Sequence, residues 1–242
     1  MPSEKKYDYS DFKEEVIKKN RFFLSQEAIV FLERLKRKAR SRELLKGDVL
    51  YRSVAHEKPI DQDSYRMEPL GDCRIRPFEN MYNQESEGRV NPSNIHCLYL
   101  SDSAIGALAE SRPEIGRPAT VAKLQAVRNL KIVDFSIPPY TDASWYAYFS
   151  EDTWQYSKAF STPLMAFESR LGYVPTQIIA EYFKSEGFDG ICYKSQFKHF
   201  DESQEEVDSL NYALFDLEAA EIIPNSKKVL KIKAQYIKYE EV

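Results

Sequence analysis

The chain has 242 residues, of which 43% are hydrophobic and 13% aromatic, and its formal net charge is −4 with a pI near 5.6. This length is sufficient for one large domain, or for one domain with an appendage. The acidic balance argues against direct interaction with nucleic acid, so an anionic ligand has to be held by a few local arginines.

No apolar stretch approaches the roughly 20 residues that cross a bilayer, and the first residues lack the apolar core of a signal peptide. We therefore expect a cytoplasmic protein that does not interact with membranes. The three cysteines and three histidines show no CxxC or other metal-ligand spacing. Neither a disulfide framework nor a metal site is expected.

Residues 10–45 have a helical pattern throughout, with a break near Ser25, a helix cap that precedes acidic first-turn positions. The basic run over residues 34–42 is interpreted either as a patch for nucleic acid or an acidic partner, or as the solvated face of an amphipathic helix whose last turn favours cations. We predict an N-terminal helical extension over residues 1–46, packed on a main domain over residues 47–242.

The main domain begins with a predicted strand. Residues 49–54 alternate between apolar and polar side chains, as in a β-strand. Tyr51 and Arg52 then point to opposite faces, so only one of them is expected to face a shared cleft. The polar, turn-rich segment from His56 to Glu87 is interpreted as a long surface connection.

The segment over residues 88–113 contains a turn, a strand and a helix, in that order. The apolar run at residues 97–100 predicts a short buried strand, and helix caps at residues 101–103 precede an apolar helical repeat that a proline ends. Glu110 lies on the same face of this helix as the small residues of the preceding turn. It is a candidate for a partly buried site; the alternative is a carboxylate in water at a frayed helix end.

Two segments follow whose organisation is less regular. Residues 119–127 and 131–135 flank a three-residue turn, a spacing that predicts a β-hairpin. The aromatic segment over residues 138–173 is interpreted as a substrate lid, as a partner surface or as a satellite core under a long loop.

A helix and a strand are predicted within residues 173–195. The helix begins near Pro175 and ends at Gly187, and the strand covers residues 191–195. Ser195 at the end of this strand is either a polar group that faces a cleft or simply the last residue of the strand.

The rest of the chain supplies two further strand-like segments, at residues 211–216 and 229–239. Glycine accounts for only 8 residues, and no glycine-rich loop follows a strand with the spacing of a dinucleotide or P-loop site. Helices interrupt the strands irregularly. We therefore favour an α+β fold over a doubly wound α/β fold.

A series of short motifs carries a resemblance to a known family. In chain order they are Tyr51-Arg52, Gly88-Arg89-Val90-Asn91-Pro92, Leu98-Tyr99, Ala109-Glu110, Pro175-Thr176-Gln177, Gly187-Phe188-Asp189-Gly190-Ile191-Cys192-Tyr193-Lys194-Ser195, and the segment from Asn211 to Asp216. Through this ordered set, residues 47–225 resemble the RES domain family, which is named after arginine, glutamate and serine positions. The chain departs at Val90, where the family usually has an aromatic residue, and at Asn94, where it commonly has a glycine. Asparagine tolerates the left-handed backbone conformation, so the turn can survive.

The resemblance implies a fold and an activity. The implied fold is ADP-ribosyltransferase-like, a split mixed β-sheet with surrounding helices and a cleft for NAD+. The implied activity is that of a toxin that destroys NAD+ by cleaving the nicotinamide–ribose bond, with phosphate or water as acceptor. The usual partner of such a toxin is an Xre-type helix-turn-helix antitoxin that covers the active site. NAD+ is then the substrate, with inorganic phosphate as co-substrate in the case of phosphorolysis, and no other cofactor is expected.

The resemblance also assigns catalytic roles to Arg52, Glu110 and Ser195, and these residue types suit the chemistry. Arg52 and Arg89 can hold the NAD+ pyrophosphate through forked contacts. The carboxylate of Glu110 can stabilise positive charge on the ribose carbon and hold the 2′-hydroxyl. The remaining expected contacts to NAD+ are made by Tyr99, Asn91 and Ser195.

Other interpretations stay open. The two arginines can instead form structural salt bridges, and Tyr99 can be a core tyrosine with a satisfied hydroxyl. A protein ADP-ribosyltransferase of the same fold would need a surface for its target, for which residues 138–173 are the candidate. A non-catalytic module that binds a nucleotide or a partner is a third alternative. A homo-oligomer is left open, as is an N-terminal extension that occludes the cleft.

Overall fold

A computed structural model of the protein describes residues 7–57, 67–76, 87–136, 151–162, 164, 169–197, 199–200 and 206–233. Within these residues, nine strands form one sheet in the order β1-β5-β6-β9-β3-β2-β4-β10, with β11 also paired to β4, and β7 and β8 form a separate pair. The strands are β1 (Arg40–Leu44), β2 (Val49–Ala55), β3 (Leu98–Ser101), β4 (Pro118–Ala126), β5 (Leu130–Asp134), β6 (Gly190–Lys194), β7 (His199–Phe200), β8 (Glu206–Val207), β9 (Leu210–Leu214), β10 (Ala220–Ile222) and β11 (Lys228–Lys231). The helices are α1 (Tyr9–Lys18), α2 (Gln26–Lys38), α3 (Asp72–Ile75), α4 (Ala104–Ser111), α5 (Glu151–Ser161), α6 (Val174–Ser185) and the 3₁₀ helix η3 (Arg170–Tyr173).

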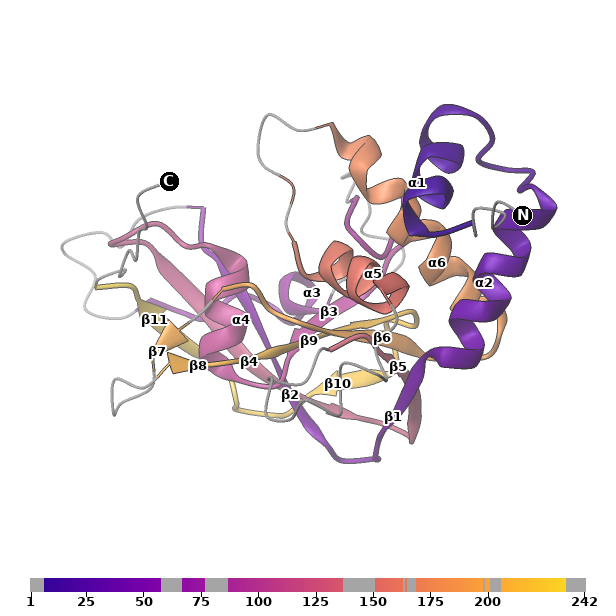
Figure 1. Ribbon diagram of the computed structural model, residues 1–242. Helices are drawn as coiled ribbons and strands as arrows, with labels where there is room; N and C mark the ends of the chain where they lie inside the picture. Colours follow the sequence, from indigo (N-terminus) through magenta and orange to yellow (C-terminus); the bar gives the residue numbers. More distant parts are fainter. Residues whose placement is uncertain are drawn as a thin grey trace, which may run out of the picture.

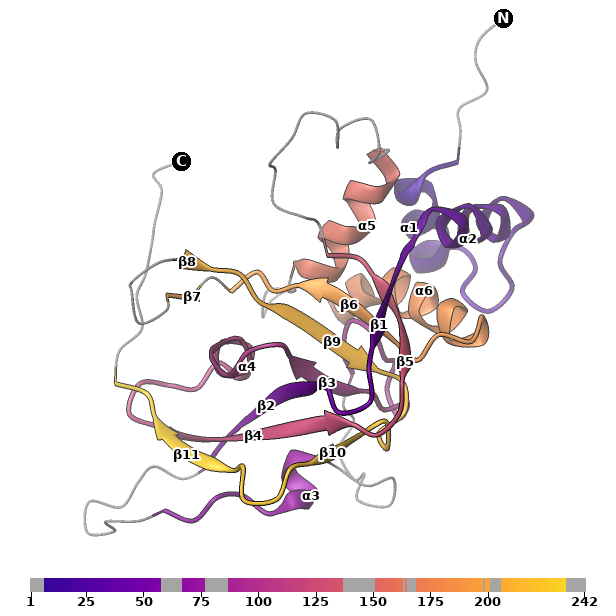
Figure 2. The same ribbon diagram turned by 90° about the horizontal axis from the view of Figure 1, so that it is seen from below.

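The sheet is mixed and it is split between β2 and β3. β5 and β6 run parallel, whereas the other neighbouring strands in the sheet are antiparallel. β2 pairs with β4 along its whole length but with β3 only where Tyr51 faces Ser101. The halves β1-β5-β6-β9-β3 and β2-β4-β10-β11 therefore diverge, and α4 lies in the opening between them (Figure 2). The predicted α+β fold with a mixed sheet and surrounding helices is confirmed.

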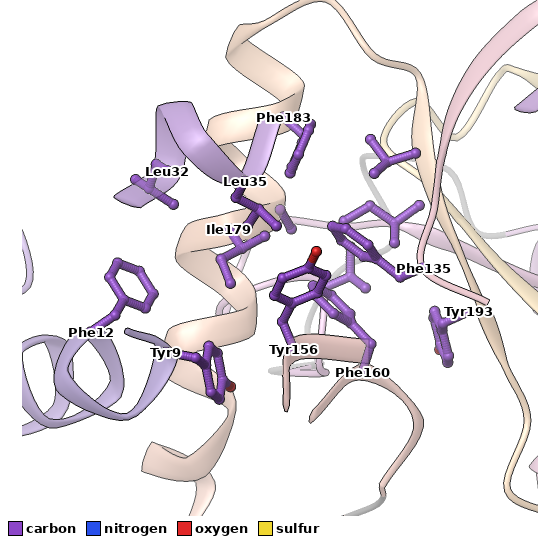
Figure 3. Close-up of a cluster of buried hydrophobic side chains, with 14 of the residues drawn as sticks. Tyr9, Phe12, Leu32, Leu35, Phe135, Tyr156, Phe160, Ile179, Phe183 and Tyr193 are labelled. Atoms are coloured by element: carbon purple, nitrogen blue, oxygen red, sulfur yellow. The ribbon is translucent and has the colours of Figure 1, made fainter. Parts of the chain in front are cut away.

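One hydrophobic cluster joins the helices to the first half of the sheet. Four helices, α1, α2, α5 and α6, gather on one side of the molecule (Figure 1). Aromatic residues of these helices pack against one another and against Phe135, which follows β5. The ring centroids of Phe12 and Phe31 lie 4.9 Å apart, as do those of Phe135 and Phe160. Phe183 of α6 joins these rings in the cluster, which Figure 3 shows in close-up. Burial of this much aromatic surface stabilises both the helices and the strands below them.

The opposite face of the sheet carries a second cluster. Alternation along each strand separates the two, so Ile191 of β6 belongs to the first cluster and Cys192 to the second. Leu98 and Leu124 are fully buried in the second cluster, and Ile75 of α3 is buried there as well. The interpretation of His56 to Glu87 as a surface connection is therefore wrong at α3, because this short helix places an apolar side chain in the core.

The N-terminal helices are confirmed, but the helical pattern does not extend to residue 45. Ser25 caps α2, its Oγ accepting a hydrogen bond from the Ala28 N–H at 3.2 Å. Residues 40–44 form β1, antiparallel to β5, and the prediction of a helix there is wrong. Helix propensity is a weak preference that tertiary pairing overrides. Here the pairing places Leu44 in the core and joins Arg42 to Asp134 in an ion pair of 2.9 Å.

The predicted hairpin of residues 119–127 and 131–135 is also wrong. Both strands exist, but β4 pairs with β2, β10 and β11, whereas β5 pairs with β1 and β6. The turn between them carries the chain from one half of the sheet to the other. Residues of this turn contact other parts of the chain. Arg128 forms an ion pair of 2.8 Å with Asp189, and Asn129 Oδ1 accepts a hydrogen bond from the Lys46 N–H at 2.9 Å.

The aromatic segment over residues 138–173 is only partly described. Tyr156 and Phe160 of α5 are buried in the first cluster beside Phe135, so this part belongs to the main core and not to a satellite core. Residues 138–150 and the side chain of Trp154 lie outside the described residues. The lid and the partner surface predicted for them stay predictions.

The elements around the predicted site are confirmed. Ser103 caps α4, α6 has Pro175 in its first turn, and Gly187 follows α6 with a φ of 78°. β6 and β9 lie where strands were expected, and β11 coincides with the start of the last predicted strand, whose residues from 234 on lie outside the described residues. None of the described helices is long and apolar enough to span a bilayer.

Candidate active site

A cleft of about 300 Å³ opens at the split of the sheet. β2 contributes residues 51–53 and β3 contributes residues 99–101, and the loop before β3 contributes residues 87–89. The other lining residues come from several elements and are Ala107, Glu110, Ser111, Tyr173, Tyr193 and Asn211. Because the two strands share a single residue pair, their facing edges are left open to a ligand.

Tyr51 and Arg52 both line the cleft, so the expectation that only one of them does is wrong. That expectation assumed a flat sheet with a ligand on one face. The cleft instead lies beside the edge of β2, which neighbouring residues reach from either face.

Glu110 is held in the opening by close packing of α4. A Cβ on Gly106 would overlap the hydroxyl oxygens of Ser101 and Ser209, so only glycine allows the helix to approach β3 and the residue before β9 this closely. Glu110 follows one turn later, half-buried at the cleft. The alternative of a fully solvated carboxylate at a frayed helix end does not describe this geometry.

Two donors fix one oxygen of this carboxylate. Glu110 Oε1 accepts a hydrogen bond from Ser195 Oγ at 2.7 Å and another from Asn211 Nδ2 at 2.5 Å. Ser195 and Asn211 are each only 4% exposed. The structure thus brings Glu110 and Ser195 together, although Ser195 itself is not among the residues that line the cleft.

Arg52 crosses the split from β2 to β3. Its Nη1 donates to the backbone carbonyl of Tyr99 at 2.9 Å, and the half-buried side chain lines the cleft. A guanidinium keeps its charge in any environment and carries five N–H donors in a planar fork.

Arg89 lines the same cleft from the loop before β3. Its Nη1 donates to the backbone carbonyl of Phe160 at 2.8 Å, and its guanidinium carbon lies 5.5 Å from the ring centroid of Tyr193. The second contact has the geometry of a cation–π interaction. α5 and β6 thus orient a nearly buried cation towards the opening.

Tyr99 and Asn91 form the support of this loop. The Tyr99 hydroxyl donates to Asn91 Oδ1 at 2.7 Å and accepts from the Val90 N–H at 3.2 Å. Burial raises the pKa of Tyr99 well above its usual value, so the phenol stays protonated and can donate. Asn91 lies behind Tyr99, 2% exposed, and its Nδ2 donates to the Ile95 carbonyl at 2.7 Å. Of the two, it is Tyr99 that lines the cleft.

The fold accommodates both residues at which the loop departs from the family pattern. Asn94 adopts a φ of 65°, the left-handed conformation that was expected of it, and Val90 is buried in the first hydrophobic cluster. Gln177 of α6 holds the loop from the other side, its Nε2 donating to the carbonyls of Gly88 at 2.9 Å and Asn91 at 3.2 Å.

Sequence reasoning did not assign a site role to Asn211, Gln177, Tyr173 or Tyr193. Asn211 could have been identified as a candidate site residue, because it is the amide in an otherwise mostly apolar strand. A buried polar side chain indicates a specific hydrogen-bonding role more strongly than a buried apolar side chain does. The contribution of Tyr173 depends on tertiary packing, which spacing alone does not reveal.

The predicted occlusion by the N-terminal extension is not seen in the described part of the chain. The cleft lining contains no residue of α1 or α2, and these helices pack beside α6 (Figure 1). Among the described residues, no group of three or more histidine, cysteine, aspartate or glutamate side chains is arranged to hold a metal ion.

A mixed sheet that opens between two strands, with a tethered carboxylate and two arginines in the opening, defines an α+β protein with a charged cleft inside its sheet. The RES domain family matches residues 49–235, so the chain belongs to this family. Among solved structures, the chain is similar to the crystal structure of the MbcT–MbcA toxin–antitoxin complex of M. tuberculosis, with 12% identity and a TM-score of 0.40, over 83% of this chain and 91% of that one. No curated protein matches the sequence.

Proposed function

We propose that the protein cleaves the nicotinamide–ribose bond of NAD+, with phosphate or water as acceptor. The observation that carries this proposal is the carboxylate of Glu110, tethered through one oxygen in a cleft that also holds Arg52 and Arg89. Membership of the RES domain family supports the same activity.

The charges in the cleft suit the charges of NAD+. The pyrophosphate carries two negative charges, which Arg52 and Arg89 can bind through charge-assisted hydrogen bonds. The nicotinamide ring is a cation, and four tyrosines of the lining offer aromatic faces or hydroxyls to it: Tyr51, Tyr99, Tyr173 and Tyr193. A neutral or purely anionic ligand would use only some of these arginines and tyrosines.

Glu110 provides what bond cleavage needs. The electron pair of the C–N bond leaves with the nicotinamide nitrogen, so positive charge develops on the anomeric carbon of the ribose, as in glycoside cleavage. A carboxylate beside that carbon stabilises the charge and can accept a hydrogen bond from the 2′-hydroxyl. The acceptor oxygen then bonds to the carbon, and water, when it is the acceptor, releases a proton to solvent.

The same proposal includes the biological role. Family membership supports a toxin of a toxin–antitoxin pair, whose helix-turn-helix antitoxin would cover the cleft. Such a protein acts where NAD+ is abundant, which agrees with the cytoplasmic location expected from the sequence.

Phosphorus NMR of the purified protein with NAD+, with and without inorganic phosphate, tests the activity. A phosphate-dependent signal of ADP-ribose 1″-phosphate would identify a phosphorylase, and ADP-ribose in both buffers would identify a hydrolase. Glu110→Gln should lower the rate roughly 100-fold or more, because it removes the negative charge. Glu114→Gln, an exposed glutamate four residues further on, is the matched control and should retain the rate. Unchanged NAD+ in both buffers would refute the proposal.

A further inference from the structure

The carboxylate of Glu110 is held asymmetrically. Both of its donors bind Oε1, Ser195 Oγ at 2.7 Å and Asn211 Nδ2 at 2.5 Å, whereas Oε2 accepts no hydrogen bond from the described part of the chain. One donor lies on β9 and the other directly after β6, its antiparallel neighbour, since Asn211 of β9 pairs with Tyr193 of β6, two residues before Ser195. One oxygen is therefore anchored to the sheet and the other is left for the cleft.

We propose that Asn211 is a positioning residue that fixes Glu110 so that Oε2 meets the ribose. The catalytic effect of Asn211 rests on the proposed function, whereas its hydrogen bond to Glu110 does not depend on that function. Asn211 suits the task because a side-chain amide keeps its N–H donors at every pH of interest. It is also 4% exposed, and a buried amide is strongly favoured to keep its hydrogen bond.

Ser195 completes the support. Its Oγ accepts a hydrogen bond from the Phe197 N–H at 3.2 Å, which leaves its own proton for Glu110. Two donors on one oxygen restrict rotation of the carboxylate about its last bond. A catalytic group held in this way loses less orientational freedom when the transition state forms.

Asn211→Asp tests the role of the amide, because it preserves the shape of the side chain and changes only the donor. The introduced carboxyl can donate to Oε1 while it is protonated, and it repels Glu110 once both are ionised. We expect the ratio of the N211D kcat to the wild-type kcat to fall at least about 10-fold from about pH 5 to about pH 8. KM for NAD+ should stay within roughly 3-fold of the wild-type value, because Asn211 acts through Glu110.

Asn129→Asp is the matched control. Asn129 Nδ2 also donates to a glutamate, Glu43 Oε1 at 3.4 Å, but on the exposed surface of the turn before β5. Its kcat ratio should stay near one at every pH. A constant N211D ratio, or an equal slope in both variants, would overturn the inference, since a merely structural loss does not depend on the protonation of the new carboxyl.

A second measurement does not require turnover. The melting temperature of N211D, relative to the wild type, should fall as pH rises, because the introduced carboxylate and the neighbouring one of Glu110 then repel each other. If this trend appears while the wild type leaves NAD+ intact, the contact stands and the proposed function fails. If the wild type cleaves NAD+ and the kcat ratio is flat, the positioning role fails.

Ser195→Ala covers the case in which N211D does not fold. It removes the other donor to Oε1 and should lower kcat roughly 10-fold at nearly constant KM, the effect of one lost hydrogen bond to a charged group. Wild-type kcat in this variant would show that anchoring of Oε1 is irrelevant to the rate, and would also overturn the inference.

Discussion

Gly106→Ala should damage both the stability and the activity of the protein. The added Cβ would lie 2.6 Å from the Cβ of Ser209, where ordinary contacts begin at about 3.5 Å. Rotation of the serine hydroxyls cannot relieve this overlap, so α4 has to retreat by about 1 Å. Overpacking of this kind costs about 1–3 kcal/mol of the free energy of unfolding.

The same retreat moves the carboxylate of Glu110. Its hydrogen bonds to Ser195 and Asn211, 2.7 and 2.5 Å long, would then exceed normal length. A misplacement of about 1 Å can cost roughly 100-fold in rate, so we expect a loss of kcat near that size.

Urea unfolding and NAD+ turnover of the folded fraction measure the two effects. The matched control is Gly71→Ala, because Gly71 has an ordinary φ of −60° and the nearest atom to its added Cβ is 3.8 Å away. This variant should be as stable as the wild type or slightly more stable. If G106A retained wild-type stability and turnover, the close approach of α4 would not be what places Glu110.

Three further predictions follow from the contacts. Arg89→Lys should raise KM for NAD+ roughly 10-fold with a smaller change in kcat, because lysine lacks the planar fork of donors that Arg89 offers to the pyrophosphate; an unchanged KM in steady-state kinetics would contradict this role. Phe12→Ala should lower the free energy of unfolding by about 3–5 kcal/mol in urea titration, since Phe12 is fully buried, and a value below about 1 kcal/mol would contradict the packing. Burial lowers the pKa of His56, so the unfolded chain binds a proton at this residue more readily than the folded protein does. The contribution of His56 to the free energy of unfolding should be fully present above about pH 6.5 and should decline as the pH falls below it. The free energy of unfolding of His56→Gln should therefore fall less steeply with decreasing pH.

The elements that local chemistry specifies were predictable from the sequence. Ser103 caps α4, Pro175 lies in the first turn of α6, and Gly187 follows α6 with a left-handed backbone conformation. Each of these signals acts within a few residues of the chain. The fold class followed from the irregular order of such elements. β1 and the partners of β4 and β5 were not predictable, because strand pairing is decided by residues far apart in the chain.

The candidate site divides in the same way. Helical periodicity made Glu110 a candidate for an inward-facing carboxylate, since it places this residue beside Gly106, but spacing alone left a solvated carboxylate open. Its partner Asn211 is 101 residues away, and only the order of the strands in the sheet joins the two. Asn91 shows the opposite case, a residue expected at the ligand whose amide instead supports Tyr99 from behind. Motif order thus indicates which residues gather, whereas the packed sheet decides which of them face the cleft.

The N-terminal segment is packed into the core of the domain and into its sheet. Phe12 and Phe31 belong to the same hydrophobic cluster as Phe183, and β1 extends the sheet beyond β5. α6 in turn holds the loop of Arg89 through Gln177. The N-terminal helices therefore support the cleft indirectly, through α6. Truncation of residues 1–45 would remove that support and one strand of the sheet, and would be expected to unfold the protein instead of activating it.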